Sequence, residues 1–287
     1  MKTPQISKTK KQKLSKPKRS VAKVIASVKQ VVKIAHISDE EAIWRWGHAE
    51  RPFLLDNQNQ IFRVGIWNVW KQSGGDQFEE EFTSFASRLD VVICQEALLT
   101  DMALRLFAQN GFEAIHAGTY RRLDGCRDGV LTMAKVAAIG NVHRVLSKTP
   151  EPLLKTTKAA LVSFYPVQAG GAPLAVVNLH ATLIRSPKSA GNEVRRIIES
   201  IEFHEGPVIF AGDFNTFSER YLDEMSKALA AIGCHHVVIE NDPRVKLARL
   251  DQVFIKNLDL KSVSIDVMTK HSDHFPIVCE FKLRISG

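Results

Sequence analysis

The 287-residue sequence has few cysteines, and their positions exclude one kind of site. The four cysteines, Cys94, Cys126, Cys234 and Cys279, are widely separated and include no C-x-x-C pair. This spacing argues against a structural zinc site. Cys94 and Cys279 lie in apolar runs typical of core strands, so we expect buried thiols and a reducing, cytoplasmic environment.

Long hydrophobic runs are also missing. The chain has no stretch of about 18 consecutive apolar residues, so no transmembrane helix is predicted. Its basic beginning lacks the compact apolar stretch and small-residue cleavage site of a secretory signal.

Acidic residues are absent from the first 33 positions, which hold eleven of the 39 lysines and arginines. The remaining residues therefore carry 28 basic and 31 acidic side chains, a net charge of −3, against +8 for the whole chain. We divide the chain into a basic, largely disordered N-terminal segment, 1–36, and a folded domain, 37–287. Apolar residues between 21 and 35 share one helical face. This face is interpreted as a marginal helix docked on the domain, or alternatively as a helix contacting nucleic acid or an anionic membrane.

From Ile61 onward, short apolar strands alternate with a few amphipathic helices. Many strands with few helices favour two sheets with helices outside over a simple parallel array. Before this region, a capping box of Ser38 and Glu41 predicts a short helix that continues to Trp46. The predicted strands lie near 62–68, 90–96, 130–134, 137–145, 160–165, 174–180, 207–211, 237, 250–255, 262–267 and 275–281, and the predicted helices near 78–89, 98–110, 194–201 and 219–231.

Polar residues suited to catalysis lie at the ends of these apolar strands. If the ends meet at one rim, they form a cluster of carboxylate, amide and imidazole groups on rigid supports. Such a cluster suits a hard, oxygen-preferring cation such as Mg²⁺ or Mn²⁺. The residues are Asn68, Glu96, His180, Asp213, Asn215 and Asp251, with His274 just before the last strand.

Four motifs occur along the chain in this order: Gln95-Glu96, Asn178-Leu179-His180, Gly212-Asp213-Phe214-Asn215 and Ser272-Asp273-His274-Phe275-Pro276. Together they resemble the endonuclease/exonuclease/phosphatase superfamily, which includes DNase I-like nucleases, abasic-site endonucleases, sphingomyelinases and inositol-phosphate phosphatases. The resemblance covers about residues 61–283 and is nearest to uncharacterised bacterial members. It implies a DNase I-like α/β fold of four layers, with two mixed sheets face to face and helices outside.

The resemblance also implies roles for the motif residues. Glu96 would be the main metal ligand, with Asn68 beside it, and Asp273 would also reach the metal. Asp213 would orient or activate the attacking water, and Asn215 would position this water and the phosphate. His274 would act as general acid or base, oriented by Asp251, and His180 would hydrogen-bond the phosphoryl oxygens.

Physical chemistry supports these roles independently of the resemblance. Attack on a phosphodiester needs an activated water, neutralised phosphoryl oxygens and a stabilised leaving oxygen, and a cation supplies Lewis-acid stabilisation. An imidazole transfers protons near neutral pH, and an adjacent carboxylate fixes its tautomer. The pairing of Asp251 with His274 follows the orienting logic of a triad without a serine nucleophile.

Further side chains are weaker candidates for substrate contact. Lys158 and Thr132 are retained as candidates for binding substrate phosphates, whereas Asp128 and Lys155 are interpreted as ordinary surface residues. Trp70 is expected to pack beneath the site with Trp67, or alternatively to stack on a base.

The sequence therefore predicts a divalent-metal-dependent phosphoester hydrolase, with a phosphodiesterase acting on nucleic acid favoured. Asn-Leu-His at residues 178–180 resembles the DNase I and sphingomyelinase branches more than the abasic-site branch. Two alternatives stay open. One is a phosphomonoesterase or phospholipid phosphodiesterase, and the other is a catalytically silent binding or scaffold protein on the same fold.

Overall fold

The computed structural model describes residues 35–56, 60–151, 156–183, 186–244 and 249–284. The chain separates into two compact units, Met1–Lys33 and Ile34–Gly287. The first unit lies outside the described residues, so the expected disorder and amphipathic helix of the basic segment stay predictions. Residues 35 and 36, which we assigned to the basic segment, belong to the second unit and form a short strand that pairs with Tyr120 and Arg121 of the same unit.

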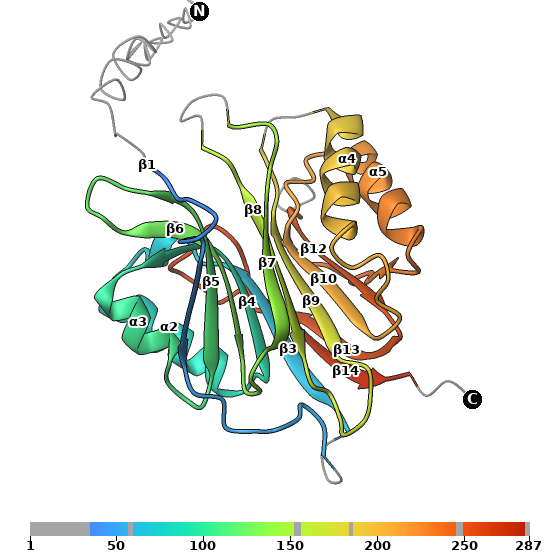
Figure 1. Cartoon of the computed structure of the whole chain (residues 1–287), viewed down its shortest axis with the longest axis horizontal. Coiled ribbons are helices and arrows are strands. Elements are labelled where there is room, and N and C mark those ends of the chain that lie inside the picture. Colours follow the sequence, from blue (N-terminus) through green and yellow to red (C-terminus); the bar gives the residue numbers. More distant parts are fainter. Residues whose placement is uncertain (1–34, 57–59, 152–155, 184–185, 245–248, 285–287) are drawn as a thin grey trace, which may run out of the picture. The chain divides into compact units, whose positions relative to one another are not determined.

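The first sheet combines strands from both ends of the second unit (Figure 1). Its order is β1-β5-β6-β4-β3-β14-β13, and β2 also pairs with β5. Only β3 and β4 run parallel, because the helix that connects them returns the chain to the same end of the sheet. The strands are β1 (Ala35–His36), β2 (Ile43–Gly47), β3 (Phe62–Asn68), β4 (Val91–Leu99), β5 (Glu113–Arg121), β6 (Arg127–Ala134), β13 (Leu258–Ile265) and β14 (Ile277–Leu283).

The second sheet has the order β11-β12-β10-β9-β8-β7. Its one parallel pair, β9 and β10, is again joined through a helix. Both sheets are therefore mixed. The strands are β7 (Ile139–Leu146), β8 (Ala159–Tyr165), β9 (Leu174–His180), β10 (Val208–Asp213), β11 (His235–His236) and β12 (Asp251–Lys256).

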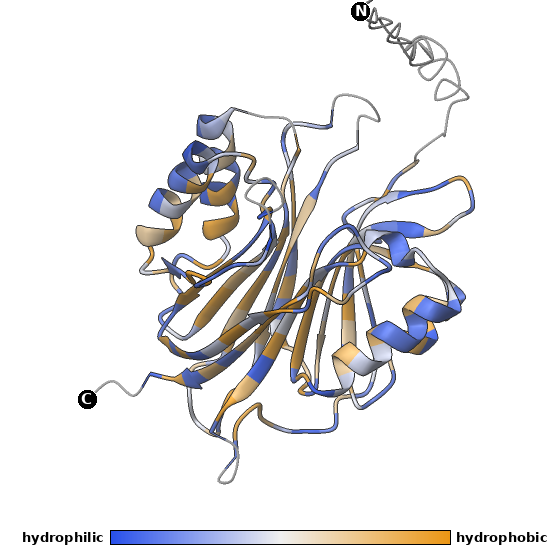
Figure 2. Cartoon of the chain, turned by 180° about the vertical axis from the view of Figure 1, so that it is seen from behind, coloured by the Kyte–Doolittle hydropathy of each residue, from blue (hydrophilic) through white to orange (hydrophobic). Residues whose placement is uncertain are grey.

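Three apolar clusters define four layers, which confirms the predicted DNase I-like sandwich. The central cluster lies between the sheets and includes Ile66, Ile93, Leu161 and Val176. The other two clusters pack helices on the outer faces, one under α2 and α3 and the other under α4 and α5 (Figures 1 and 2). The helices are α2 (Asp76–Ser87), α3 (Asp101–Phe107), α4 (Pro187–Ile198) and α5 (Glu219–Ala230), with a short 3₁₀ turn η1 (Trp70–Gln72).

The predicted helix after Ser38 is wrong. The backbone N–H of Glu41 does donate to the Ser38 hydroxyl at 3.4 Å, but a turn and then strand β2 follow. β2 pairs with β5 along its whole length, and the guanidinium of Arg127 lies 5.0 Å from the ring centre of Trp44. Aromatic and β-branched residues are good strand formers, and pairing with β5 satisfies their backbone, so tertiary context overrides the local cap.

Helix α3 is shorter than predicted, because Leu98 and Leu99 belong to β4. Thr100 caps the helix by accepting a hydrogen bond from the Ala103 N–H at 3.1 Å. In the described part of the chain, no helix is long and apolar enough to cross a membrane.

Candidate active site

Strand register brings three predicted site residues into line across the second sheet. Asp213, the last residue of β10, is paired with His180 at the end of parallel β9. On its other side Asp213 is paired with Asp251, the first residue of antiparallel β12. The carboxyl ends of two strands and the start of a third therefore meet at one edge.

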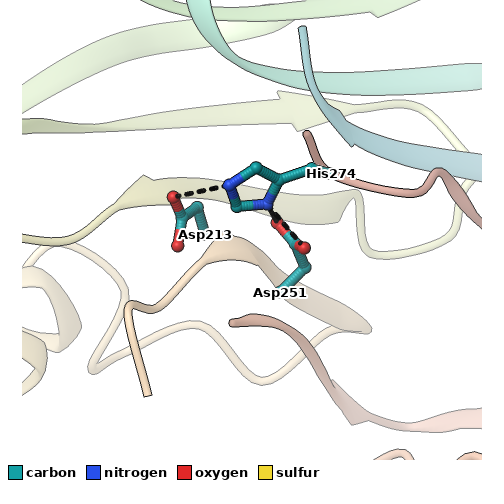
Figure 3. Close-up of side chains that lie close together, drawn as sticks. All are labelled: Asp213, Asp251 and His274. Atoms are coloured by element: carbon teal, nitrogen blue, oxygen red, sulfur yellow. Dashed lines mark hydrogen bonds and ion pairs between the residues drawn. The ribbon is translucent and has the colours of Figure 1, made fainter. Parts of the chain in front are cut away.

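His274 lies between the two aspartates of this row (Figure 3). Its Nδ1 is 2.9 Å from Asp251 Oδ2, and its Nε2 is 3.9 Å from Asp213 Oδ2. Burial disfavours the imidazolium, but the carboxylates of Asp251 and Asp213 outweigh burial and raise the pKa of His274 to about 10. The imidazole is thus protonated at neutral pH, with Nδ1 donating to Asp251 and Nε2 facing Asp213.

The loop that carries His274 is pinned to the first sheet. The Trp67 indole N–H donates to the His274 carbonyl at 3.2 Å, and the Ser272 hydroxyl donates to the Asn68 carbonyl at 2.6 Å. Trp67 itself is buried among the phenylalanines of α2, as expected for a residue beneath the site. The histidine is therefore held from the first sheet and oriented by an aspartate of the second.

Asp213 is buried and held by two amide groups. The Asn68 amide donates to its Oδ2 at 3.1 Å, and the Asn215 backbone N–H donates to its Oδ1 at 2.9 Å. Burial, followed by the neighbouring Asp251 carboxylate, raises the pKa of Asp213 to about 6. Asn215 adopts a left-handed φ of 50°, and its side-chain amide donates to the Ala181 carbonyl at 2.8 Å.

Glu96 sits at an irregularity in β4, where pairing with β6 shifts register between Cys94 and Ala97. Its φ of 51° is left-handed, which is rare for a residue with a side chain. Side chains satisfy the carbonyls that the interrupted ladder leaves: Asn178 donates to Cys94 at 3.0 Å, and the His116 ring nitrogen lies 3.0 Å from the Ala97 oxygen. The bulge turns the Glu96 side chain toward the cleft.

The Glu96 carboxylate faces cations on several sides. Lys71 Nζ donates to Oε2, and Lys158 Nζ and His180 Nε2 lie 3.7 and 3.9 Å from Oε1. Burial opposes the charged form, but Lys158 and Lys71 outweigh it and lower the pKa of Glu96. Glu96 is therefore ionised at neutral pH.

These side chains line one cleft of about 360 Å³. Eight of the ten predicted residues line it: Asn68, Glu96, Lys158, His180, Asp213, Asn215, Asp273 and His274. Asp251 lies behind His274 and acts on the cleft through the imidazole.

Thr132 is not placed to contact substrate. It is 0% exposed within β6 and lies between the sheets, where the Asn178 amide donates to its hydroxyl at 3.4 Å. Its position on the inward face of β6 removes it from the cleft, so its prediction as a substrate-binding residue is wrong. Asp128 is buried near Lys71 and is not an ordinary surface residue, whereas Lys155 lies outside the described residues.

Sequence reasoning gave no role to four supporting side chains. Lys71 contacts Glu96, and Gln95 donates to Asn178 at 2.8 Å across the two sheets. Arg244 is buried, lies 3.6 Å from Asp251 Oδ2, and is anchored by Asp242 at 3.0 Å. Only Gln95 and Asn178 carried a signal, because both fall inside the quoted motifs.

The donor set of the cleft fits a hard divalent cation. Glu96 offers an ionised carboxylate, and Asn68 and Asp273 add an amide and a carboxylate on the same cleft. Asp213, Asp251 and His274 also offer ligand atoms that all lie within 4.8 Å of one another. In that second group His274 Nδ1 is occupied by its hydrogen bond to Asp251, and in the first group Glu96 Oε2 accepts from Lys71.

The fold and the residues that line the cleft resemble those of phosphoester hydrolases, and comparisons with known proteins identify the family. The sequence profile of the Endonuclease/Exonuclease/phosphatase family matches residues 65–274, so the chain belongs to this family. A UPF0294 protein of Vibrio campbellii is 30% identical over 238 residues, which cover 82% of each chain. Family members are generally phosphoester hydrolases that use divalent metals.

Solved structures show the same fold at low sequence identity. An endonuclease/exonuclease/phosphatase from Beutenbergia cavernae has a TM-score of 0.60 and 17% identity, covering 78% of this chain and 72% of its own. ANGEL2, described as a 2′,3′-cyclic phosphatase and solved with adenosine-2′,3′-vanadate, has a TM-score of 0.61 and 14% identity, covering 78% of this chain and 96% of its own.

Proposed function

We propose that the protein is a divalent-metal-dependent phosphodiesterase that acts on nucleic acid. The observation that carries this proposal is the row His180, Asp213 and Asp251, with His274 bridging the two aspartates opposite the ionised Glu96. One cleft thus contains an acid, a base and an anchor for a cation.

Glu96, Asn68 and Asp273 would hold Mg²⁺ or Mn²⁺, which supplies Lewis-acid stabilisation of negative charge on the phosphoryl oxygens. The ionised state of Glu96 and the oxygen-rich lining support this assignment. Mg²⁺ and Mn²⁺ share this ligand preference, so both are candidates.

Asp213 and His274 divide the proton transfers between them. With a pKa of about 6, Asp213 is largely ionised at pH 7 and accepts a proton from the attacking water, whose oxygen bonds to phosphorus. His274 is protonated and donates from Nε2 to the leaving oxygen as its bond to phosphorus breaks. Asn215 positions the water, and His180 and Lys158 contact the phosphoryl oxygens.

One feature favours nucleic acid over a phospholipid, and a second favours polyanions in general. The cleft rim carries the rings of Trp70 and Phe217, 47% and 39% exposed, and flat aromatic surfaces stack on bases. The basic N-terminal segment adds a sequence-independent attraction for polyanions. ANGEL2, a fold neighbour, binds an adenosine derivative.

The four free cysteines fit a reducing, cytoplasmic location.

Hydrolysis of bis-(p-nitrophenyl) phosphate and of a DNA and RNA panel tests the proposal. Wild type is compared with Asp213→Ala and His274→Ala in Mg²⁺, Mn²⁺ or EDTA, with the exposed Asp223→Ala and His143→Ala as matched controls. Activity that needs metal and disappears only in the two cleft variants supports the hydrolase. Activity retained in those variants would place the chemistry elsewhere.

The alternatives from the sequence have their own outcomes. Hydrolysis of phosphomonoesters or phospholipids but not nucleic acid would favour a phosphatase or sphingomyelinase-like enzyme. Absence of hydrolysis together with absence of Mn²⁺ binding would favour a binding or scaffold protein.

A further inference from the structure

Three consecutive residues after β3 adopt a left-handed backbone. Trp70, Lys71 and Gln72 have φ angles of 41°, 58° and 54°. L-residues with side chains avoid this region because Cβ approaches the neighbouring carbonyl, and runs of such residues are rarer than single ones. A run of three non-glycine residues persists only where surrounding contacts fix it.

The contacts that fix this turn come from the end of β3 and from β4. The Trp70 N–H donates to the Asn68 side-chain oxygen at 3.1 Å, and the Val69 N–H donates to the Gln95 carbonyl at 3.0 Å. The buried Gln72 side chain accepts from the Leu98 N–H at 3.1 Å. The left-handed turn is therefore tied to β4 on either side of Glu96.

The left-handed turn places the Lys71 ammonium beside the Glu96 carboxylate. Lys71 donates to Glu96 Oε2, while Lys158 lies 3.7 Å from Glu96 Oε1. The carboxylate that best suits a metal ion thus has a lysine beside each oxygen. Lys71 is also the more accessible lysine, since its side chain is 35% exposed against 15% for Lys158.

An ammonium in this position affects two ligands in opposite ways. It repels a cation that shares Glu96, and it attracts the phosphoryl oxygens of a substrate on the same cleft. A lysine on a flexible stem can move from carboxylate to phosphate, whereas the backbone beneath it stays fixed.

We propose that Lys71 is a substrate phosphate-binding residue. In the free protein the left-handed turn holds its ammonium against the Glu96 carboxylate. When a metal ion takes Glu96, the Lys71 ammonium transfers to a non-bridging phosphoryl oxygen. The inference rests on the proposed hydrolase function and adds a residue to its binding machinery. Lys71 therefore weakens metal binding to the free protein and strengthens substrate binding to the metal-loaded protein.

The test compares Lys71→Met with Lys71→Arg, with the exposed Lys261→Met as a charge-matched control away from the cleft. Mn²⁺ alone is titrated by calorimetry, and KM and kcat are measured on bis-(p-nitrophenyl) phosphate. For Lys71→Met we expect Mn²⁺ affinity to increase roughly fivefold or more and KM to increase roughly tenfold. Lys261→Met should stay close to wild type, and Lys71→Arg, which keeps the positive charge, should shift both values less than Lys71→Met does.

Opposite signs in the two measurements distinguish this role from a structural ion pair. If Lys71 only supported Glu96, its removal would leave Mn²⁺ affinity unchanged or reduce it, and either result overturns the inference. An unchanged KM with wild-type turnover also overturns it. If wild type hydrolyses nothing, the proposed function fails, and Mn²⁺ and inorganic phosphate titrations on the same variants still decide the role of Lys71. Absence of Mn²⁺ binding to wild type would overturn both.

Discussion

The imidazole of His274 contacts both carboxylate oxygens of Asp251, with Nδ1 lying 3.1 Å from Oδ1 and 2.9 Å from Oδ2. Behind them, the buried guanidinium of Arg244 lies 3.6 Å from the same carboxylate. Asp251 is thus held from one side and orients the histidine on the other. The arrangement fixes the tautomer and keeps Nε2 directed at Asp213.

Asp251→Asn should therefore reduce kcat by about 10² to 10⁴ while leaving the fold intact. The amide cannot neutralise the imidazolium, so the pKa of His274 should fall toward its ordinary value. Steady-state kinetics and an NMR titration of His274 measure the two effects. Asp223→Asn on the surface of α5 is the control, and a kcat within about threefold of wild type would contradict the orienting role.

The pH dependence follows from the raised pKa of Asp213, about 6. Below this pH the carboxyl is protonated and cannot accept a proton from water, so kcat/KM should rise with pH through about 6. His274 loses its proton near its raised pKa of about 10, and activity should decline there.

A pH–rate profile of wild type and Asp251→Asn measures both limbs. In the variant the alkaline limb should move to lower pH, because the carboxylate that raises the His274 pKa has gone. A profile that is flat or falling across pH 6 would remove Asp213 from the role of base.

Asn178 joins the two sheets beneath the cleft and should be important for stability. Its amide donates to the carbonyls of Cys94 and Leu131 at 3.0 and 2.8 Å, and its oxygen accepts from Gln95 at 2.8 Å. Asn178→Leu leaves these buried groups unsatisfied and should lower the free energy of unfolding by about 3 kcal/mol. Urea denaturation measures the loss. Asn141→Leu on the exposed face of β7 should change it by less than about 0.5 kcal/mol, and equal effects would contradict the prediction.

Trp70 offers a direct test of the nucleic-acid proposal. Trp70→Ala should raise KM for a single-stranded oligonucleotide by about 5- to 100-fold, because it removes a stacking surface at the cleft. KM for an abasic oligonucleotide of the same length and charge should be unaffected. Trp44→Ala, which removes a similarly exposed indole from β2, is the control. An equal increase in KM for both oligonucleotides would mean that Trp70 does not stack on bases.

Deletion of residues 1–33 tests the basic segment. Removal of eleven positive charges should weaken nucleic-acid binding and flatten its salt dependence, since fewer counterions are released. Binding titrations at several salt concentrations measure this. Co-sedimentation of the full chain, but not the truncated chain, with anionic liposomes would point to a membrane instead.

Much of the site was predictable because its chemistry is local in the sequence. Gln95-Glu96, Asn178-Leu179-His180 and Asp213-Phe214-Asn215 lie at or just after strand ends, and strand periodicity is visible without a structure. The alternation of strands and helices indicated two sheets with helices outside, and the resemblance carried by the motifs implied the four-layer order. The pairing of Asp251 with His274 was implied by the resemblance and agreed with the logic of a carboxylate that orients an imidazole.

The tertiary structure decided which side chains meet. A strand replaced the helix expected after Ser38, because the pairing of β2 with β5 is a long-range contact that no local cap encodes. Thr132 lies between the sheets because it is on the inward face of β6. Lys71 contacts Glu96 because contacts with β4 fix a left-handed turn after β3. Sequence periodicity reports local backbone geometry and side-chain chemistry. Register, bulges and left-handed turns depend on partners distant in the chain, and they determined the final geometry of the cleft.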